Sequence, residues 1–281
     1  MKKKRLCKHC GGEQYRYRSN TSTLVAEPCE CLATCGCDEL QYRWVHVSYE
    51  TGRIVPEAGP NTYEAQAKCK RCAPVYELVR RLNEARFPTK HGGKSKPITK
   101  EQKPLYAYLR QWVKAWDEGA VGFTLCGAVG VGKSQALVAA ARALVEKRRV
   151  AVRFSHAPQL LHTIKLDIER GLASSARFHE LCQVPVLAID EVAELRTEWE
   201  QQIISDVLLA RYQAGLTTMA TTNLVMVAED GGLDDEELVD QLGSAGRRVA
   251  SRMHEFMPLL VVGGADLRRL RPADKQAKLE V

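Results

Sequence analysis

One eight-residue segment constrains the fold of this chain more than any other feature. It reads Gly127-Ala128-Val129-Gly130-Val131-Gly132-Lys133-Ser134 and fits the pattern G-x-x-x-x-G-K-[ST] in full. Glycines let the backbone curl so that several N–H groups point inward at one anion. An apolar stretch at residues 123–126 precedes the segment, and a helical stretch from residue 135 follows it. This order predicts a phosphate-binding loop between a strand and a helix.

Each part of the loop has an expected contact with a nucleotide. The ammonium of Lys133 would reach the β- and γ-phosphates, and the hydroxyl of Ser134 would bind Mg²⁺. The following helix would point its positive N-terminal end at the same anion. ATP and Mg²⁺ are therefore the predicted cofactors. The predicted nucleotide-binding residues are Gly127, Gly130, Val131, Gly132, Lys133, Ser134 and Gln135.

Beyond residue 120, short apolar stretches alternate with longer stretches of helical periodicity. The expected strands are 121–126, 150–155, 186–189, 217–221 and 259–262. The expected helices are 134–148, 158–169, 200–214 and 234–255, the last broken near Gly243. Strands that are apolar almost throughout are buried on both faces, as in a parallel sheet. We therefore predict a doubly wound α/β domain, placed at residues 105–281.

Two expected strands end in polar side chains that suit ATP hydrolysis. Asp190 and Glu191 follow an apolar strand, whose end should open onto the ligand crevice. Asp190 would hold Mg²⁺ through its water shell, and Glu191 would polarise the attacking water. If the strand 217–221 lies between the loop strand and the acidic strand, Asn223 or Thr222 could orient that water. The alternative is a polar residue that only caps the strand.

Arginines on the last expected helix are further catalytic candidates. Arg248 and Arg252 are spaced i, i+4 and share one helix face, and Arg247 lies beside them. An arginine that reached the γ-phosphate of a neighbouring subunit would neutralise charge in the transition state. This mechanism requires an oligomer, and the alternative is a solvated basic face.

Eight of the ten cysteines lie before residue 73. They occur in closely spaced pairs, a spacing that suits tetrahedral zinc, and redox or incidental cysteines are the alternative. We predict a zinc-binding module at residues 1–73, with one or two ions, and a helix with a Lys-, Gly- and Pro-rich linker at 74–104. The predicted ligands are Cys7, Cys10, Cys29, Cys31, Cys35, Cys37, Cys69 and Cys72.

The positive charge of the chain is concentrated in its first third. Residues 1–104 contain 20 Lys and Arg against 11 Asp and Glu, whereas the rest of the chain contains 21 against 23. A basic module favours nucleic acid or an acidic protein surface as its partner, and a solvated surface is the alternative. There is no long apolar run and no apolar leader, so we expect no membrane span and a cytoplasmic location.

These elements, in this order, resemble AAA+ ATPases of the bacterial helicase-loader and IstB-like group, to which DnaC and DnaI belong. The resemblance covers about residues 120–263 and includes the stretches between the motifs. These stretches are 152–161, 211–224, and 242–253. The insertion of residues 244–247 departs from the usual pattern before the arginine helix. The chain after Gly263 is short for a helical lid domain, so the resemblance implies an AAA+ core without a full lid.

The resemblance implies a role in DNA replication. Such a protein would bind a hexameric replicative helicase and help to place it on single-stranded DNA under ATP control, as a homo-oligomer when bound to ATP and its partner. It also favours Arg252, then Arg248, as the arginine finger, and a zinc-bearing N-terminal module as the helicase contact. Two alternatives stay open: a transposition helper of the IstB type, which binds duplex DNA and a transposase, and a zinc-dependent binding protein in which ATP acts only as a switch.

Overall fold

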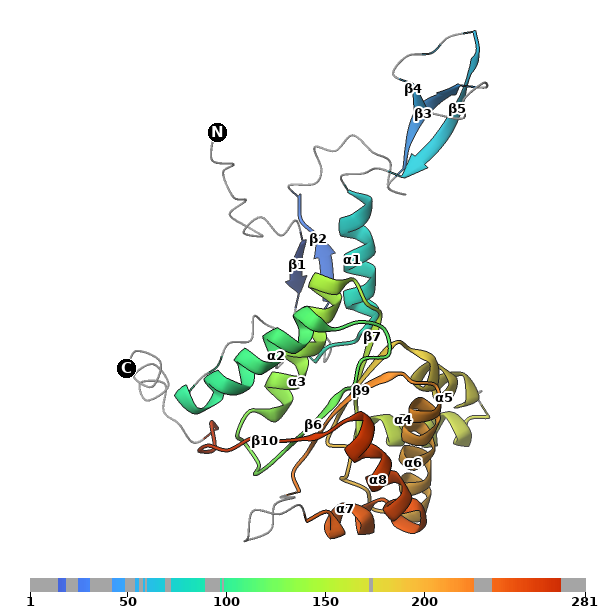
Figure 1. The fold of residues 1–281 in the computed structure, drawn as a ribbon. Helices are drawn as coiled ribbons and strands as arrows, with labels where there is room; N and C mark the ends of the chain where they lie inside the picture. The colour runs from blue at the N-terminus through green and yellow to red at the C-terminus, as the bar shows by residue number, and fades with distance from the viewer. Residues whose placement is uncertain are drawn as a thin grey trace.

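The computed structural model of this chain describes residues 15–18, 25–30, 42–48, 54–55, 58, 60–68, 72–88, 97, 99–171, 174–224 and 234–268. They form a five-stranded sheet with helices packed on it, a two-stranded hairpin and a separate three-stranded sheet (Figure 1). In these ranges no helix is both long enough and apolar enough to cross a membrane.

The five-stranded sheet is parallel throughout, in the order β10-β6-β9-β8-β7. Its strands are β6 Phe123–Cys126, β7 Val152–His156, β8 Val186–Asp190, β9 Thr217–Thr222 and β10 Leu259–Val261. Strands β6, β8 and β9 are buried along their whole length, as expected for a sheet covered on both faces. The predicted α/β architecture and its parallel sheet are therefore confirmed, and each strand boundary falls within two residues of its expected position.

The strand order brings the predicted motifs together. β9 lies between β6 and β8, with Leu125 opposite Thr221 and Ile189 opposite Ala220. The phosphate-loop strand and the acidic strand therefore flank the strand that leads to Asn223. This meets the condition under which Asn223 could orient a water molecule.

Helices cover both faces of the sheet (Figure 1). One core contains Val186 and Ala188 and is closed by α1 to α3, while the other contains Leu187 and Ile189 and is closed by α4 to α8. The helices are α1 Ala73–Glu84, α2 Lys103–Ala115, α3 Lys133–Ala143, α4 Ala157–Glu169, α5 Ser174–Gln183, α6 Glu198–Gln213, α7 Glu236–Gln241 and α8 Gly246–Phe256. Shorter helical turns are η2 Lys100–Gln102, η3 Leu144–Arg148 and η4 Gly243–Ala245. Helix α5 was not among the expected helices.

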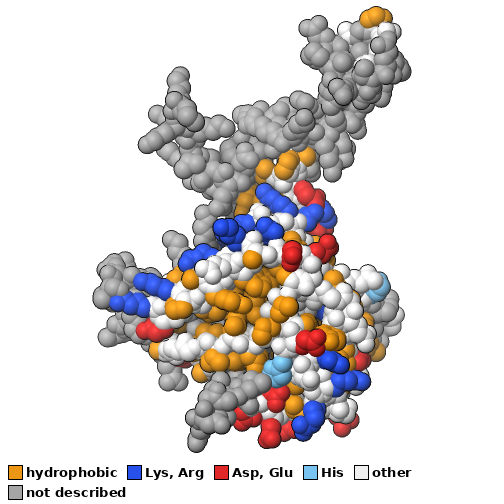
Figure 2. All heavy atoms as spheres, in the orientation of Figure 1, with side chains coloured by type: hydrophobic (Ala, Val, Ile, Leu, Met, Phe, Trp, Pro, Cys, Tyr) orange, Lys and Arg blue, Asp and Glu red, His pale blue; other side chains and the backbone are white. Residues whose placement is uncertain are grey.

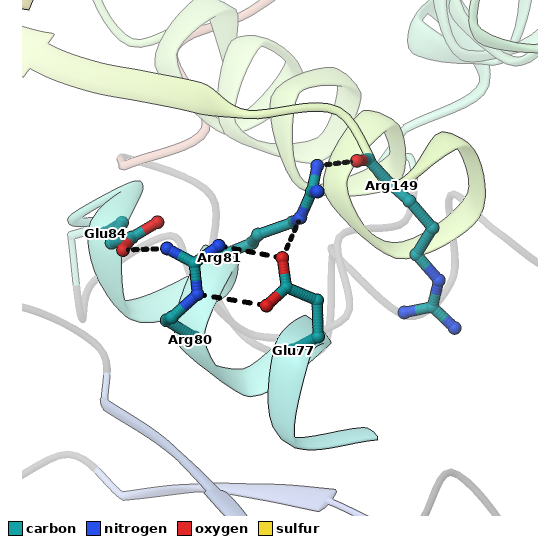
Figure 3. Close-up of polar contacts among 5 residues, drawn as sticks. All are labelled: Glu77, Arg80, Arg81, Glu84 and Arg149. Carbon is teal, nitrogen blue, oxygen red and sulfur yellow. Dashed lines mark hydrogen bonds and ion pairs between the residues drawn. The ribbon is translucent and has the colours of Figure 1, made fainter. Parts of the chain in front are cut away.

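Helix α1 packs on the domain that contains the five-stranded sheet. Leu82 and Phe87 are fully buried in the same apolar cluster as β6 and α3, and Phe154 N–H of β7 donates to Ala85 O at 2.9 Å. Arg81 on α1 also donates to the carbonyl of Arg149, at the end of η3 (Figure 3). Part of the segment that we expected to be a helix and linker therefore contributes to the core.

A small antiparallel hairpin packs on α1. It consists of β1 Tyr15–Arg18 and β2 Val25–Pro28. Asn83 of α1 exchanges two hydrogen bonds with the backbone of Ala26, at 2.7 and 3.0 Å. Tyr15 Oη donates to Glu146 Oε1 at 2.8 Å. The hairpin is thus attached to the core through α1 and η3.

The remaining strands form a three-stranded antiparallel sheet in the order β4-β3-β5. Their bounds are β3 Tyr42–Ser48, β4 Ile54–Val55 and β5 Thr62–Lys68. Most of the predicted cysteine module lies outside the described residues.

Candidate nucleotide-binding and hydrolysis site

The phosphate loop has the backbone conformation that its glycines permit. Gly127, Gly130 and Gly132 have φ angles of 140°, 85° and 97°. These positive values favour glycine because a side chain would clash with the backbone there. Lys133 begins α3 directly after the loop, so the N-terminal end of α3 faces the loop. The strand, loop and helix predicted from the sequence are all present.

The outer side of this loop packs against other parts of the chain. A Cβ atom on Gly127 would meet the carbonyl of Val262, one on Gly130 would meet the Asp266 carboxylate, and one on Gly132 would meet the Gln102 amide. The Gly130 carbonyl accepts a hydrogen bond from the N–H of Leu267 at 3.0 Å. The Gln102 amide also donates to Val131 O at 2.9 Å. The glycines are therefore required for packing on the outside of the loop as well as for an anion inside it.

Lys133 is positioned inside the loop. Its side chain is 5% exposed, and Nζ donates to Gly127 O at 2.6 Å and Ala128 O at 2.7 Å. Burial lowers the pKa of Lys133, while the nearby carboxylates of Asp190 and Glu191 oppose this shift. An ammonium held by two carbonyls has a third N–H for a phosphate oxygen, so the loop fits a nucleotide phosphate.

The expected magnesium ligands line one cavity. Ser134 and Asp190 both border a space of about 560 Å³ at the ends of the strands. Asp190 Oδ1 accepts a hydrogen bond from Thr221 Oγ1 at 2.6 Å. A hydroxyl and a carboxylate are hard oxygen donors of the kind that Mg²⁺ prefers, usually with several waters retained. The residues present therefore fit Mg²⁺ between the loop and β8.

Glu191 is held by a network of polar contacts. Its backbone has φ 59°, and its N–H donates to Thr221 Oγ1 at 2.9 Å. Its carboxylate lies 2.7 Å from Nε2 of His156 and also hydrogen-bonds Asn223 and Glu194. Burial would raise the pKa of Glu191, but its contacts with Glu194, His156 and Asn223 lower it overall. A carboxylate that stays ionised can polarise a water molecule.

Three residues of this network were not singled out from the sequence. Thr221 links the Asp190 carboxylate to the backbone of Glu191, because its hydroxyl donates to Asp190 and accepts from the N–H of Glu191. His156 pairs in register with Asp190 across β7 and β8, which places it at the same sheet edge. Glu194 hydrogen-bonds Glu191, and this contact raises the pKa of Glu194. The sequence signal that could have identified His156 as a site residue is its position, as a polar residue at the end of a strand next to the acidic strand.

The candidate finger arginines lie on the exposed face of α8. Arg247, Arg248 and Arg252 are all exposed. The guanidinium of Arg252 lies 5.1 Å from the centre of the Tyr212 ring and 3.4 Å from Glu255 Oε2. Neither arginine of the i, i+4 pair lines the cavity beside Asp190. Their exposure leaves them available to a neighbouring subunit, as the finger hypothesis requires.

Two of the eight predicted zinc ligands are described. Cys29 follows β2 and Cys72 precedes α1, and both side chains are buried. Across the described parts of the chain, no group of three or more His, Cys, Asp and Glu side chains is placed to hold a metal ion. The other six predicted ligands, Cys7, Cys10, Cys31, Cys35, Cys37 and Cys69, lie outside the described residues. The zinc site stays a prediction.

The parallel sheet, the phosphate loop and the acidic strand define the core as an AAA+ P-loop ATPase fold. The chain is similar to the crystal structure of the DnaC helicase loader, with 24% identity and a TM-score of 0.52 over 66% of this chain and 99% of that one. This likeness supports the fold, and at this level of identity it does not establish the activity.

Two further solved structures show weaker likeness. The crystal structure of DnaI matches with 20% identity and a TM-score of 0.45, over 58% of this chain and 82% of that one. Domain III of the Thermotoga maritima replication initiation protein DnaA matches with 14% identity and a TM-score of 0.49, over 63% and 69%. No protein-family model and no curated protein sequence matches the chain.

Proposed function

We propose that this chain is an ATP-dependent loader that binds a hexameric replicative helicase and single-stranded DNA. The observation that carries the proposal is the meeting of Lys133, Asp190 and Glu191 at one end of the parallel sheet. The fold likeness to the DnaC helicase loader supports the choice of this class. Among the described residues, no structural observation favours the alternative function, a transposition helper that binds duplex DNA and a transposase.

The side chains at the site suit ATP hydrolysis. Mg²⁺, held by Ser134 and Asp190, would neutralise charge on the phosphates. Lys133 binds the same phosphates from inside the loop. Glu191 takes the proton of the attacking water, and Asn223, which contacts its carboxylate, orients it. Placement of an arginine from α8 of a second subunit would complete the site and couple hydrolysis to assembly.

The exposed face of α2 is our candidate surface for single-stranded DNA. A shallow groove of about 590 Å³ is lined by Pro97, Lys100, Lys103, Pro104, Ala107 and Arg110. Lys and Arg side chains follow the line of this helix in Figure 2. The lining contains three basic residues and no acidic one. Such a groove attracts the phosphate backbone without reading sequence.

The groove assignment is tested by charge reversal. The Lys103→Glu, Arg110→Glu double variant should bind an oligothymidylate at least ten-fold more weakly than the wild type, with a shallower dependence on salt, because two phosphate contacts are lost. Fluorescence anisotropy at several salt concentrations measures both. The matched control is Lys147→Glu, an exposed lysine on η3. Equal losses in the control and the double variant would refute the groove.

The proposed function is tested with the full zinc-loaded chain and the replicative helicase of the same genome. The wild type should hydrolyse ATP and capture the helicase in a pull-down. Lys133→Ala should lose ATP binding, while Glu191→Gln should bind ATP yet lose hydrolysis by roughly 100-fold or more, because the base is gone. No helicase capture with or without ATP would exclude a loader. Full loading by Glu191→Gln would instead favour a protein in which ATP is only a switch.

A further inference from the structure

The cavity beside Asp190 is also lined by a cluster of arginines. Ser134, Asp190 and Glu191 line it, and so do Arg86, Arg153 and Arg177. These arginines come from the turn after α1, from β7 and from α5. The proposed hydrolysis reaction assigns no role to them. Their convergence on one cavity points to an anionic ligand.

Arg153 is the buried member of this cluster. It is 5% exposed, and its Nη1 lies 3.3 Å from Glu84 O and 3.2 Å from Glu180 Oε1. Its Nε is buried and has no hydrogen-bond acceptor among the described residues. A buried N–H without an acceptor is unfavourable, so an acceptor supplied by a ligand would be stabilising.

The charges around Arg153 do not balance within the cluster. Burial lowers the pKa of Arg153, Glu180 opposes this shift, and the positive charges of Arg86 and Arg177 add to it. Arg177 is paired with Asp167 through a 3.0 Å contact. Among the described residues, the ion pairs of these arginines are those of Arg153 with Glu180 and Arg177 with Asp167, and the Glu180 side chain is 44% exposed. An anion in the cavity would reduce the repulsion between the arginines.

We propose that this cavity is a second phosphate-binding site, which receives inorganic phosphate after ATP hydrolysis. The proposal rests on the hydrolysis proposed above. In that reaction water attacks the γ-phosphorus, the bond to the ADP oxygen breaks, and the products are ADP, inorganic phosphate and a proton. The cavity connects the residues at the reaction centre to Arg153, so the leaving anion enters it without passing back through the loop. Arginine suits this ligand because its N–H groups match a tetrahedral oxyanion.

The same geometry favours a small anion over a polynucleotide. The Arg153 guanidinium is almost fully buried, whereas a DNA backbone would need an open track of exposed cations. The face of α2 offers such a track, whereas the unsatisfied donor beside the cavity, Nε of Arg153, is buried. Free phosphate is therefore the ligand that we assign to the arginine cluster.

The first experiment isolates the cavity from the phosphate loop. In the Lys133→Ala background, potassium phosphate should raise the midpoint of thermal unfolding relative to potassium chloride at equal ionic strength. This shift should disappear when Arg153→Gln is added and persist with Arg142→Gln. Arg142 is a matched control because it is also a buried arginine with one glutamate partner, Glu146. An unchanged shift in the Arg153→Gln variant, or no shift in the Lys133→Ala parent, would overturn the proposal.

The second experiment measures the kinetic consequence in chains with an intact loop. Inorganic phosphate should inhibit steady-state ATP hydrolysis by the wild type, and the inhibition constant should rise at least five-fold in Arg153→Gln. Arg153→Lys should fold and keep part of the inhibition, because the charge remains. The same inhibition constant in the wild type, Arg153→Gln and Arg153→Lys would contradict the proposal.

A third arm separates phosphate from DNA and from the proposed function. If an oligothymidylate, but not inorganic phosphate, depends on Arg153 for binding, the assignment to free phosphate is wrong. If the wild type neither binds nor hydrolyses ATP, the proposed function fails. The shift in unfolding midpoint caused by phosphate in the Lys133→Ala variant would still report binding to the cavity. The failure of the proposed function and the failure of the phosphate site are therefore distinguishable.

Discussion

At the scale of single residues, a fully buried cation in the described part of the chain has an unusual number of hydrogen-bond acceptors. Arg211 on α6 is 0% exposed. Its guanidinium donates to the carbonyls of Leu181, Val184 and Thr217 and to the hydroxyl of Thr218, at 2.6 to 2.9 Å. Burial lowers the pKa of Arg211 to about 10, so it stays charged at neutral pH. It thereby ties the end of α5 to the starts of β8 and β9.

We predict that Arg211→Met destabilises the core. The free energy of unfolding should fall by roughly 3 kcal/mol or more, because hydrogen bonds to a charged group are lost and buried carbonyls are left without donors. Chemical denaturation followed by circular dichroism measures the change. The control is Arg142→Met, which removes a buried arginine paired with Glu146. If Arg211→Met lowers the free energy of unfolding no more than the control does, these hydrogen bonds contribute little to stability.

At the scale of elements, α1 shows how a segment read as a connection becomes part of the core. On its exposed side, Glu77 contacts both Arg80 and Arg81, and Glu84 contacts Arg80 (Figure 3). Arg81 also donates a hydrogen bond to the carbonyl of Arg149, which connects this network to the residue after η3. Hydrogen bonds from Arg80 and then Arg81 lower the pKa of Glu77 to about 2. The network therefore depends on an ionised Glu77.

The pH dependence of α1 follows from this shift. A carboxyl whose pKa is lowered from 4.5 to about 2 stabilises the fold above pH 4.5 and loses that contribution as the pH falls to about 2. The Glu77 side chain is 40% exposed, and solvent screens its charge, so the effect should be small. The midpoint of thermal unfolding, measured between pH 7 and pH 2, should be higher for the wild type than for Glu77→Gln at neutral pH. The two midpoints should converge near pH 2. Glu118→Gln is the control, and a gap that persists at pH 2 would show that the charge of Glu77 is not the cause.

At the scale of the whole molecule, the α/β core could be predicted from the sequence, and the segments that pack on it could not. The parallel sheet follows from strands that are apolar almost throughout, and the loop and Asp190 follow from local motifs at strand ends. The contact of His156 with Glu191 depends on the register of β7 and β8, which adjacent residues in the sequence do not encode. Helix α5 was missed because few of its residues are apolar. The packing of α1 on β7 is likewise a contact between distant segments.

The same arrangement leads to the last prediction, which concerns the zinc module and the core together. Cys29 and Cys72 are buried at the ends of β2 and α1, and these two elements are joined through Ala26 and Asn83. A zinc ion held by the cysteines of residues 1–73 would supply folding free energy that so small a module cannot obtain from an apolar core.

We therefore expect the Cys7→Ser, Cys72→Ser double variant to lose zinc and to become sensitive to proteolysis before residue 73. ATP affinity at the loop should change little, because α1 is also held by Leu82 and by the hydrogen bond between Ala85 and Phe154. Elemental analysis measures the zinc content, and limited proteolysis shows whether residues 1–73 are folded. Nucleotide titration measures the ATP affinity of the loop. Full zinc stoichiometry in the double variant would assign the metal to other cysteines. Loss of ATP binding together with zinc would show that the module and the core fold as one cooperative unit.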